Sequence, residues 1–297
     1  MTKQLISEMR REDRRARMGL VAAQQPGDLG LAKLARELGV VELWHYLHAG
    51  NGDSAIARRA SQINLDELER QTVGLGAHFI IPGDPGWSSG LGDLVWSEPV
   101  SDFGGEPFGL WVSGPGALVG APTVAIVGSR AATAYGEHVA MDWALGLAQH
   151  GYTVISGGAY GIDAAAHRGA IAAKATTVAI MAGGLGRLYP SGNDTLLHRI
   201  RHDGLMISEA PPDCPPSRSR FLARNRLIAA LAQATIIVEG AVRSGAQNTA
   251  SWALSLGRPV LAAPGPVTSA MSVTPHRLVR NGQATLVTSL EDILGAL

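Results

Sequence analysis

The sequence predicts an α/β fold in which a doubly wound, mainly parallel sheet follows a small helical N-terminal domain. From residue 123 onward, apolar runs of four to six residues alternate with helical segments, which is typical of a parallel sheet with helices on both faces. Polar, mostly glycine-rich turns directly follow four of these runs. Residues 10–78 instead carry the patterns of short helices.

The helical N-terminal region is predicted to span residues 1–78. A connector over residues 79–122, rich in Gly, Pro, Trp and Ser, then leads into a sheet domain over residues 123–297. Because Gly and Pro interrupt regular structure, we expect an irregular connector with one strand at residues 110–112. Apolar spacing in the N-terminal region predicts helices over residues 31–38, 41–48 and 65–75.

The elements of the sheet domain follow from the same alternation. The expected strands lie at residues 124–127, 153–155, 178–181 and 236–239. The expected helices lie at residues 137–150, 164–173, 195–202, 221–232, 246–256 and 290–294. Strands that are joined by helices in this way run parallel, so their carboxyl ends meet at one edge of the sheet.

The four polar turns lie at that edge. They occupy residues 128–130, 157–163, 183–190 and 244–249. Ligands of open α/β sheets bind beyond the carboxyl ends of the strands, where glycine admits close backbone approach and helix N-termini offer unpaired N–H groups to an anion. We therefore expect a phosphorylated ligand.

Composition narrows the class of protein. The chain has 297 residues, of which 46% are hydrophobic and 17% charged, as in globular proteins of one or two domains. The single cysteine, Cys214, has no partner for an internal disulfide. No apolar run approaches the roughly 20 residues of a membrane span. We expect a cytoplasmic protein that does not contact the membrane.

The net charge of zero conceals an uneven distribution. Residues 1–123 carry eleven Lys and Arg against fifteen Asp and Glu, whereas residues 124–297 carry fourteen against ten. The second part therefore favours a polyanionic partner. Its cations are almost all arginine, which suits bidentate contacts to phosphate and stacking on bases.

Two common nucleotide-binding signatures are missing. The first turn of a dinucleotide-binding domain reads G-x-G-x-x-G, but here Arg130 stands at the third position, where a bulky cation would block a pyrophosphate. The Walker A pattern G-x-x-x-x-G-K-[ST] does not occur. We therefore do not expect ATP hydrolysis.

A basic cluster forms the second signal. Arg218, Arg220, Arg224 and Arg226 lie within nine residues that contain no acid. Phe221 and Arg224 are three positions apart, so they share one face at the start of a helix. This pairing suits a base stacked on Phe221 with its phosphate on Arg224, while a solvated set of arginines beside a core phenylalanine remains the alternative.

Seven ordered blocks then carry a family resemblance. They lie at residues 126–130, 156–163 with 166–167, 189–190 with 193, 208–211, 221 with 224–226, 238–239 with 244–245 and 249–250, and 264–265. In these blocks the chain resembles the DNA-processing protein A family, also called DprA or Smf. The resemblance covers about half of the chain closely and the rest loosely.

The resemblance implies an extended Rossmann-like fold that follows a small SAM-like domain. It implies a recombination mediator of natural transformation that binds and protects single-stranded DNA, loads the RecA recombinase, acts as a homodimer and has no catalytic activity, cofactor or metal. The family's DNA-contacting arginines correspond to Arg130, Arg224 and Arg226. The predicted DNA- and phosphate-binding residues are Gly128, Ser129, Arg130, Gly157, Gly158, Tyr160, Gly161, Arg187, Tyr189, Asn193, Phe221, Arg224, Asn225, Arg226, Ser244, Gly245 and Thr249.

Three departures from the family pattern affect these expectations. Many members have a lysine directly after Tyr-Pro, where this chain has Ser191, so this part of the basic pocket is expected either to be weaker or to be supplied by Arg187. Residues 272–284 differ from the family's usual Ser- and Gly-rich turn. Because the family's dimer surface involves this end of the sheet, the sequence does not specify the dimer interface here. The chain ends at Leu297, so the winged-helix-like C-terminal domain of many members is expected to be missing.

Two other classes of function remain open at this point. A nucleotide-binding or nucleotide-hydrolysing protein related to phosphoribohydrolases would share the sheet and its turns. Its Pro-Gly-Gly-x-Gly-Thr-x-x-Glu signature is not present, because Ala250 and Ser251 follow Thr249 with no glutamate in reach. A purely structural or adaptor role would leave the anion-ready turns unexplained.

Several polar residues have a structural interpretation. Asp163 and His167 are four positions apart, which would suit acid–base chemistry, but we expect an acid that caps N–H groups and a partly buried histidine. Glu209 and Glu239 are expected to accept hydrogen bonds from turn amides. The histidines 138, 150, 198, 202 and 276 show no metal-ligand spacing.

Overall fold

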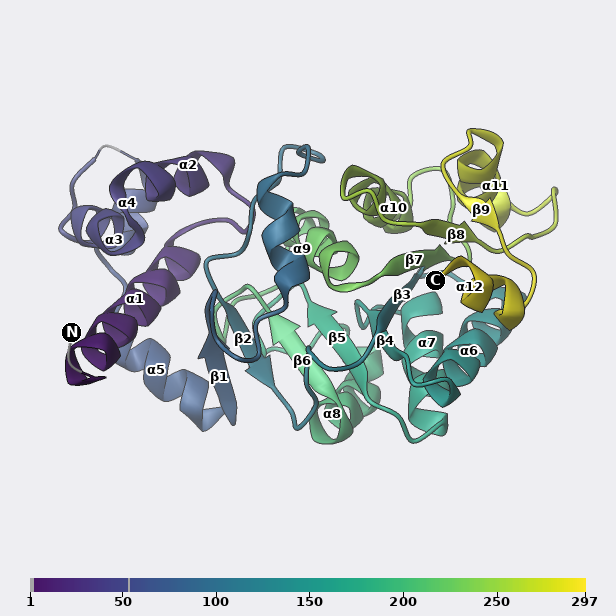
Figure 1. Cartoon of the computed structure of the whole chain (residues 1–297), viewed down its shortest axis with the longest axis horizontal. Helices are drawn as coiled ribbons and strands as arrows, with labels where there is room; N and C mark the ends of the chain where they lie inside the picture. The colour runs from purple at the N-terminus through teal and green to yellow at the C-terminus, as the bar shows by residue number, and fades with distance from the viewer. Residues whose placement is uncertain (1–2, 53) are drawn as a thin grey trace.

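The computed structural model describes residues 3–52 and 54–297. In these residues a nine-stranded sheet runs through the molecule in the order β1-β2-β6-β5-β4-β3-β7-β8-β9 (Figure 1). Neighbouring strands from β6 to β9 run parallel, and β2 and β1 extend the sheet antiparallel beyond β6. This confirms the predicted mainly parallel α/β fold.

Most of the predicted strands are present. The strands are β1 (Ala77–Ile80), β2 (Leu110–Ser113), β3 (Thr123–Val127), β4 (Thr153–Ser156), β5 (Thr177–Met181), β6 (Leu205–Ser208), β7 (Ala234–Ile237), β8 (Val260–Ala262) and β9 (Thr285–Leu286). Strand β7 ends two residues before the predicted end, so Glu239 lies in the turn that follows. Strands β1, β6, β8 and β9 were not predicted, because apolar runs of two to four residues do not distinguish strand from helix.

Helices precede the sheet and join its strands. They are α1 (Lys3–Ala23), α2 (Leu29–Leu38), α3 (Val40–His48), α4 (Ala55–Ala60), α5 (Leu65–Gly74), α6 (Ala134–Gln149), α7 (Ile162–Ala172), α8 (Asp194–Asp203), α9 (Arg218–Leu231), α10 (Gly245–Ser255), α11 (Val273–Arg280) and α12 (Leu290–Ala296), with 3₁₀ turns η1 (Ser89–Val95), η2 (Ser191–Asn193) and η3 (Ala270–Ser272). No range was predicted for α1, α4 or α11, and the first half of α1 is dense in charged residues.

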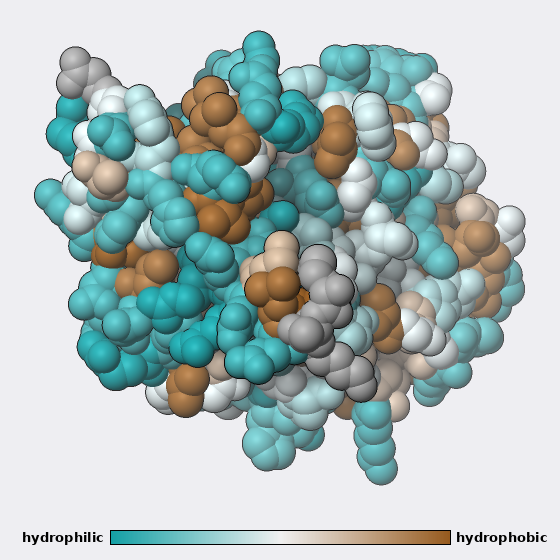
Figure 2. All heavy atoms as spheres, turned by 60° about the vertical axis from the view of Figure 1, so that its left-hand side comes forward, coloured by the Kyte–Doolittle hydropathy of each residue, from teal (hydrophilic) through white to brown (hydrophobic). Residues whose placement is uncertain are grey.

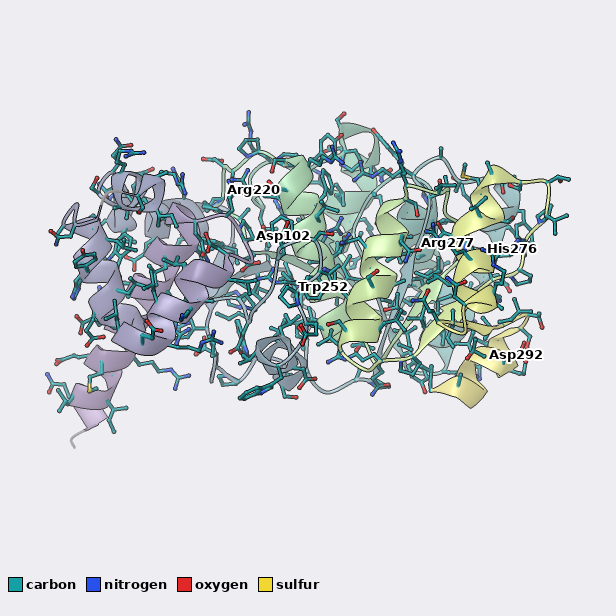
Figure 3. All side chains as sticks on the ribbon, turned by 90° about the horizontal axis from the view of Figure 1, so that it is seen from above. Asp102, Arg220, Trp252, His276, Arg277 and Asp292 are labelled. Atoms are coloured by element: carbon teal, nitrogen blue, oxygen red, sulfur yellow. The ribbon has the colours of Figure 1, made fainter. Side chains whose placement is uncertain are left out.

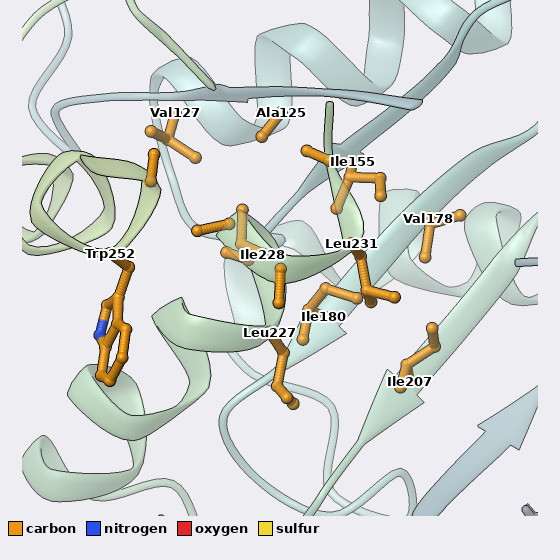
Figure 4. Packing of buried hydrophobic residues seen from close by; sticks show 14 of the residues in the cluster. Ala125, Val127, Ile155, Val178, Ile180, Ile207, Leu227, Ile228, Leu231 and Trp252 are labelled. Carbon is orange, nitrogen blue, oxygen red and sulfur yellow. The ribbon is translucent and has the colours of Figure 1, made fainter. Parts of the chain in front are cut away.

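Alternate residues of each strand face opposite layers of helices. Ala125 and Val127 of β3 pack with residues of α9 and α10 (Figure 4). Val124 and Ile126 pack with residues of α6 and α7 on the other face. The sheet is therefore covered on both faces, which places the loops beyond its carboxyl edge at the surface.

The helical N-terminal region packs against the β1-β2-β6-β5 end of the sheet. Leu43 of α3 belongs to the same buried cluster as Trp111 of β2 and Met181 of β5. The Trp111 Nε1 donates to Thr72 Oγ1 of α5 at 2.9 Å. Strand β1 crosses the predicted division at residue 78. The domain boundaries at residues 78 and 122 stay a prediction.

The surface of the N-terminal region is mostly hydrophilic. Figure 2 brings this side forward and shows separate hydrophobic patches among hydrophilic residues. Among the helices of residues 3–52 and 54–297, none is long and apolar enough to cross a membrane.

Candidate nucleic-acid interface

A pocket of about 640 Å³ opens where the order of the strands reverses. The chain passes from β3 to β4, β5 and β6 on one side, and β7 and β8 lie on the other. Such a switch point is where open α/β sheets bind their ligands. The pocket brings together nine of the predicted site residues, which are Gly128, Ser129, Arg130, Phe221, Arg224, Asn225, Ser244, Gly245 and Thr249.

A cation and two aromatic rings meet at the mouth of this pocket. The Cζ atom of exposed Arg130 lies 4.3 Å from the centroid of the Phe221 ring. The Arg224 Cζ lies 5.8 Å from the same centroid, which confirms that Phe221 and Arg224 share a helix face. Tyr189, 46% exposed, meets Phe221 edge to face at 6.0 Å between ring centroids. An unstacked base and a phosphate both find suitable groups here.

Arg224 forms part of the pocket wall although it is only 6% exposed. Its Nη1 donates to Ile180 O at 2.7 Å, while its buried Nε has no hydrogen-bond partner in the described residues. The guanidinium packs against Gly157, where any Cβ would collide with it. Burial lowers the pKa of Arg224 to about 10, against the opposing effect of Asp163, so the side chain is cationic at neutral pH.

Asp163 also lines the pocket and organises the turn that follows β4. Its Oδ2 accepts the N–H groups of Gly157 at 3.1 Å and Ala159 at 3.4 Å, which confirms the prediction that it caps N–H groups. Burial raises the pKa of this carboxyl, while Arg224 and the two N–H groups oppose the rise. The N–H groups of Gly157 and Ala159 therefore already have an acceptor within the protein.

His167 does not reach the pocket. It is fully buried rather than partly buried as predicted, and its Nδ1 lies 2.8 Å from Thr177 Oγ1 of β5. Burial lowers the pKa of His167 to about 3, so the ring is neutral at physiological pH. Asp163 and His167 do not form an acid–base pair facing the pocket.

The first turn of α10 offers an anion site to the pocket. The N-cap residue Ser244 makes no side-chain capping bond, and its buried Oγ lacks a partner among the residues described. Gly245 borders open space where a Cβ would point. Free N–H groups and the positive end of the helix dipole favour a phosphate at this position.

Arg226 is a correction to the predicted site. Its Nη1 and Nη2 donate to Glu209 Oε2 at 2.6 Å and Oε1 at 2.7 Å, and its Nε donates to Gly105 O at 3.1 Å. It is 1% exposed and does not line the pocket. Residues two apart on a helix point about 200° apart, which puts Arg226 opposite Arg224.

The two glutamates at strand ends behave differently. Glu209 pairs with Arg226, so the prediction that it binds turn amides is wrong. Glu239 accepts from Thr133 N at 2.9 Å and Thr133 Oγ1 at 2.7 Å, as predicted. It thereby holds the end of the turn that carries Arg130.

The remaining predicted residues of the β4 turn shape the backbone beside the pocket. Asn193 is buried, and its Nδ2 donates to Gly158 O at 3.1 Å and Ala159 O at 3.0 Å. Gly161 has φ of +69° and lies against the backbone of Ser129, so only glycine allows this approach. Tyr160 is 42% exposed.

Of the predicted turn after β5, Tyr189 reaches Phe221 at the mouth of the pocket, but the glycines at its start do not line the pocket. A Cβ at Gly184 would collide with the backbone of Pro211 and Pro212, and Gly184 N donates to Cys214 O at 2.8 Å. The proline-rich loop over residues 211–216 therefore covers the start of this turn. Carbonyl oxygens of the loop accept hydrogen bonds from the N–H groups of Gly184 and Gly186. Arg187 is exposed outside the pocket.

Several lining residues were not in the predicted site, among them two arginines and a methionine. Arg218, Arg243 and Met271 border the pocket. Arg218 belongs to the basic cluster, and Arg243 directly precedes the Ser244 turn, so both had a signal in the sequence. Beside the pocket, Arg277 of α11 turns toward α10 and donates to Gln247 Oε1 at 2.8 Å (Figure 3).

The fold and pocket define a Rossmann-like α/β protein with an arginine-lined pocket at the switch point of its sheet. Comparison with known families is more specific. Residues 79–297 match the model of the family described as DNA recombination-mediator protein A. The chain belongs to this family.

Individual relatives agree with that assignment. The putative DNA processing protein DprA of Mycobacterium tuberculosis is 45% identical over 284 residues, which cover 91% of this chain and 71% of the relative. The X-ray structure of DprA from Streptococcus pneumoniae has a TM-score of 0.78 at 29% identity and covers 93% of this chain and 95% of that one. The structure of DprA from Helicobacter pylori, which describes the single-stranded DNA binding mode of that protein, has a TM-score of 0.63 at 26% identity. It covers 74% of this chain and 94% of that one.

Proposed function

We propose that this chain binds single-stranded DNA in the pocket between β3 and β7 and acts as a recombination mediator. The observation that carries the proposal is the stack of Arg130 on Phe221, 4.3 Å apart, beside the uncapped start of α10. An aromatic plane takes an unstacked base of any sequence, while guanidinium and N–H groups take its phosphates. The single-stranded DNA binding of the Helicobacter pylori relative supports the same ligand.

The binding residues of this proposal are those that reach the pocket. Arg130 and Arg224 contact phosphate together with the first N–H groups of α10, and Phe221 stacks a base with Tyr189 at its edge. Asn225 holds the two helices in place, since its Nδ2 donates to Asn248 Oδ1 of α10 at 3.1 Å. Arg226 is left out because it is buried, outside the lining of the pocket, in its pair with Glu209.

The proposal extends to partners and cellular role. Membership of the family supports a mediator that protects incoming single strands in natural transformation, loads the RecA recombinase onto them and acts as a homodimer in the cytoplasm. It has no catalytic step of its own. A strand held by its phosphates and one stacked base leaves other bases free to pair.

Titration of a fluorescent oligo-dT at two salt concentrations tests this function, with duplex and mononucleotide competitors. We expect tight binding that weakens with salt through counterion release, and little competition by duplex or mononucleotide. If a mononucleotide competes in the micromolar range and the oligomer binds no better, the pocket is a nucleotide site. Release of free base from nucleotides would then be measured.

A further inference from the structure

A second groove lies between α7 and α8, on the face of the sheet opposite α9 and α10. Its volume is about 970 Å³. The floor includes Ile171 and Leu196, which are half-buried, and the rim includes Arg168, His198 and Arg199, which are exposed. An apolar floor with a cationic rim fits bases below and phosphates above.

Helical spacing aligns the two walls of this groove. Arg168, Ile171 and Ala172 are spaced at i, i+3 and i+4 on α7, and Thr195, Arg199 and His202 are spaced at i, i+4 and i+7 on α8. Residues so spaced share one helix face. The α8 wall from residue 195 to 202 is about 10 Å long at 1.5 Å per residue, which is room for a short stretch of extended strand.

The charges of the groove favour an anion. Its arginines are Arg168, Arg199 and Arg201, and its histidines are His198 and His202. Two acids lie beside them: Asp203 pairs with Arg199 and His202, and Asp194 pairs with His198 at 3.3 Å. Arg168 forms no ion pair in the part of the chain that the structure describes. The buried Nε of Arg201 likewise has no hydrogen-bond partner there.

Tyr160 lies between this groove and the pocket between β3 and β7. Ala159 lines that pocket, and the next residue, Tyr160, is 42% exposed. The Tyr160 hydroxyl accepts the N–H of Gly192 at 3.1 Å, and Gly192 lines the groove. A strand leaving the pocket past Ala159 therefore meets an exposed aromatic ring and then the groove.

We propose that the α7/α8 groove holds the continuation of the single strand whose first nucleotides occupy the pocket. Tyr160 stacks a base at the passage, Arg168 and Arg199 contact the following phosphates, and Ile171 and Leu196 support the bases. This inference rests on the proposed function, because the pocket determines where the strand starts. It gives each protomer a longer footprint than the pocket alone.

Oligonucleotide length separates the two sites in an experiment. Binding of oligo-dT of about four and about sixteen nucleotides, the range of single-strand site sizes, is measured for the wild type, Arg168→Ala/Arg199→Ala and Arg36→Ala. Arg36 is exposed on α2, away from both sites. The double variant is expected to bind the long oligomer about tenfold more weakly, with a salt slope lower by about 1.4, since each single-strand phosphate contact contributes about 0.7.

The same variants give the result that would overturn the inference. The short oligomer should bind the double variant as it binds the wild type, and Arg36→Ala should change neither. If the double variant bound the long oligomer with wild-type affinity, the proposed binding of DNA in the groove would be refuted. The groove would then suit another occupant, such as an acidic helix of a partner protein. Failure of the wild type to bind either length would instead refute the proposed function.

Hydroxyl-radical footprinting provides a readout that needs no variant. The long oligomer should protect Tyr160, Leu196 and His198 in the wild-type protein, whereas the short oligomer should protect Phe221 and leave Leu196 and His198 unchanged. Equal modification of Leu196 and His198 with and without the long oligomer would contradict the proposal.

Discussion

The guanidinium carbon of Arg130 lies 4.3 Å from the ring centroid of Phe221, although the two residues are far apart in the sequence. Arg130 follows β3, and Phe221 lies in the first turn of α9. The parallel sheet brings them together because α9 packs across β3, β4 and β5. The stack therefore depends on the fold, and each residue can be tested for its own part in binding.

Replacing Phe221 by Leu should weaken binding of oligo-dT by about 1 to 3 kcal/mol, the usual effect of losing one base–aromatic stack. The salt dependence should stay the same, because no phosphate contact is lost. Fluorescence anisotropy at several salt concentrations measures both quantities. Tyr46→Leu removes an exposed aromatic ring of α3 and serves as the control, and equal losses in the two variants would refute the stacking role.

Replacing Arg130 by Ala should weaken binding by about 1 to 3 kcal/mol and also reduce the salt slope by about 0.7, the contribution of one single-strand phosphate contact. The Arg130 side chain is exposed, so the free energy of unfolding should hardly change. The same titrations and a urea denaturation curve measure these effects. A slope equal to that of the wild type would argue against a phosphate contact.

Replacing Gly157 by Ala should displace the Arg224 side chain although Arg224 itself is kept. The new Cβ would collide with the Arg224 guanidinium, so the arginine must leave its bond to Ile180 O. We expect oligo-dT affinity to fall about as far as in Arg224→Ala, together with a loss of stability of about 1 to 3 kcal/mol from overpacking. Gly74→Ala, where the Cβ meets open space in α5, is the control.

The Glu209–Arg226 pair should matter for stability. The two side chains are 4% and 1% exposed and bond through both oxygens. Removing one partner leaves a buried charge, so Arg226→Ala should lower the free energy of unfolding by about 3 to 5 kcal/mol. Urea denaturation measures it. Glu209→Leu/Arg226→Met should recover part of the loss, and an Arg226→Ala protein of wild-type stability that bound DNA poorly would return Arg226 to the binding site.

Asp84 should make the attachment of α1 dependent on acid pH. Burial opposes its ionisation, but hydrogen bonds from Arg14, Arg10 and the Ile81 N–H outweigh burial and lower the pKa of Asp84 to about 2, from 3.8. A lowered pKa stabilises the folded state fully above the unfolded value, and this stabilisation disappears as pH falls from about 3.8 through 2.

Urea denaturation of Asp84→Asn tests this dependence. At pH 6 the variant should be less stable than the wild type by about 1.5 to 3 kcal/mol, as for hydrogen bonds to a charged group. The difference should be constant down to pH 5 and shrink below pH 4. Asp142→Asn, an exposed acid on α6, controls for the change of charge, and a difference that persisted at pH 2.5 would contradict the assignment.

Local patterns predicted much of the fold and part of the site. Strands β3, β4 and β5 were identified from apolar runs, and the turns after β3 and β7 from their glycine and serine residues, because these signals lie within a few neighbouring residues. Helix α1 was missed, since its helical state depends on packing of its second half against α3 and α4. Family resemblance led to Arg130 and Arg224, which the structure places in the wall of one pocket.

The sequence by itself determined strands β2, β3, β4, β5 and β7 and the polar turns that follow four of them at one edge of the sheet. Only the tertiary structure decided which of those turns line the pocket. The loop at Pro211 and Pro212 covers Gly184, and Glu209 engages Arg226 while the Nε of Arg224 stays unpartnered among the described residues. Such choices depend on groups distant in the chain, whose hydrogen bonds and burial exist only once the layers have packed.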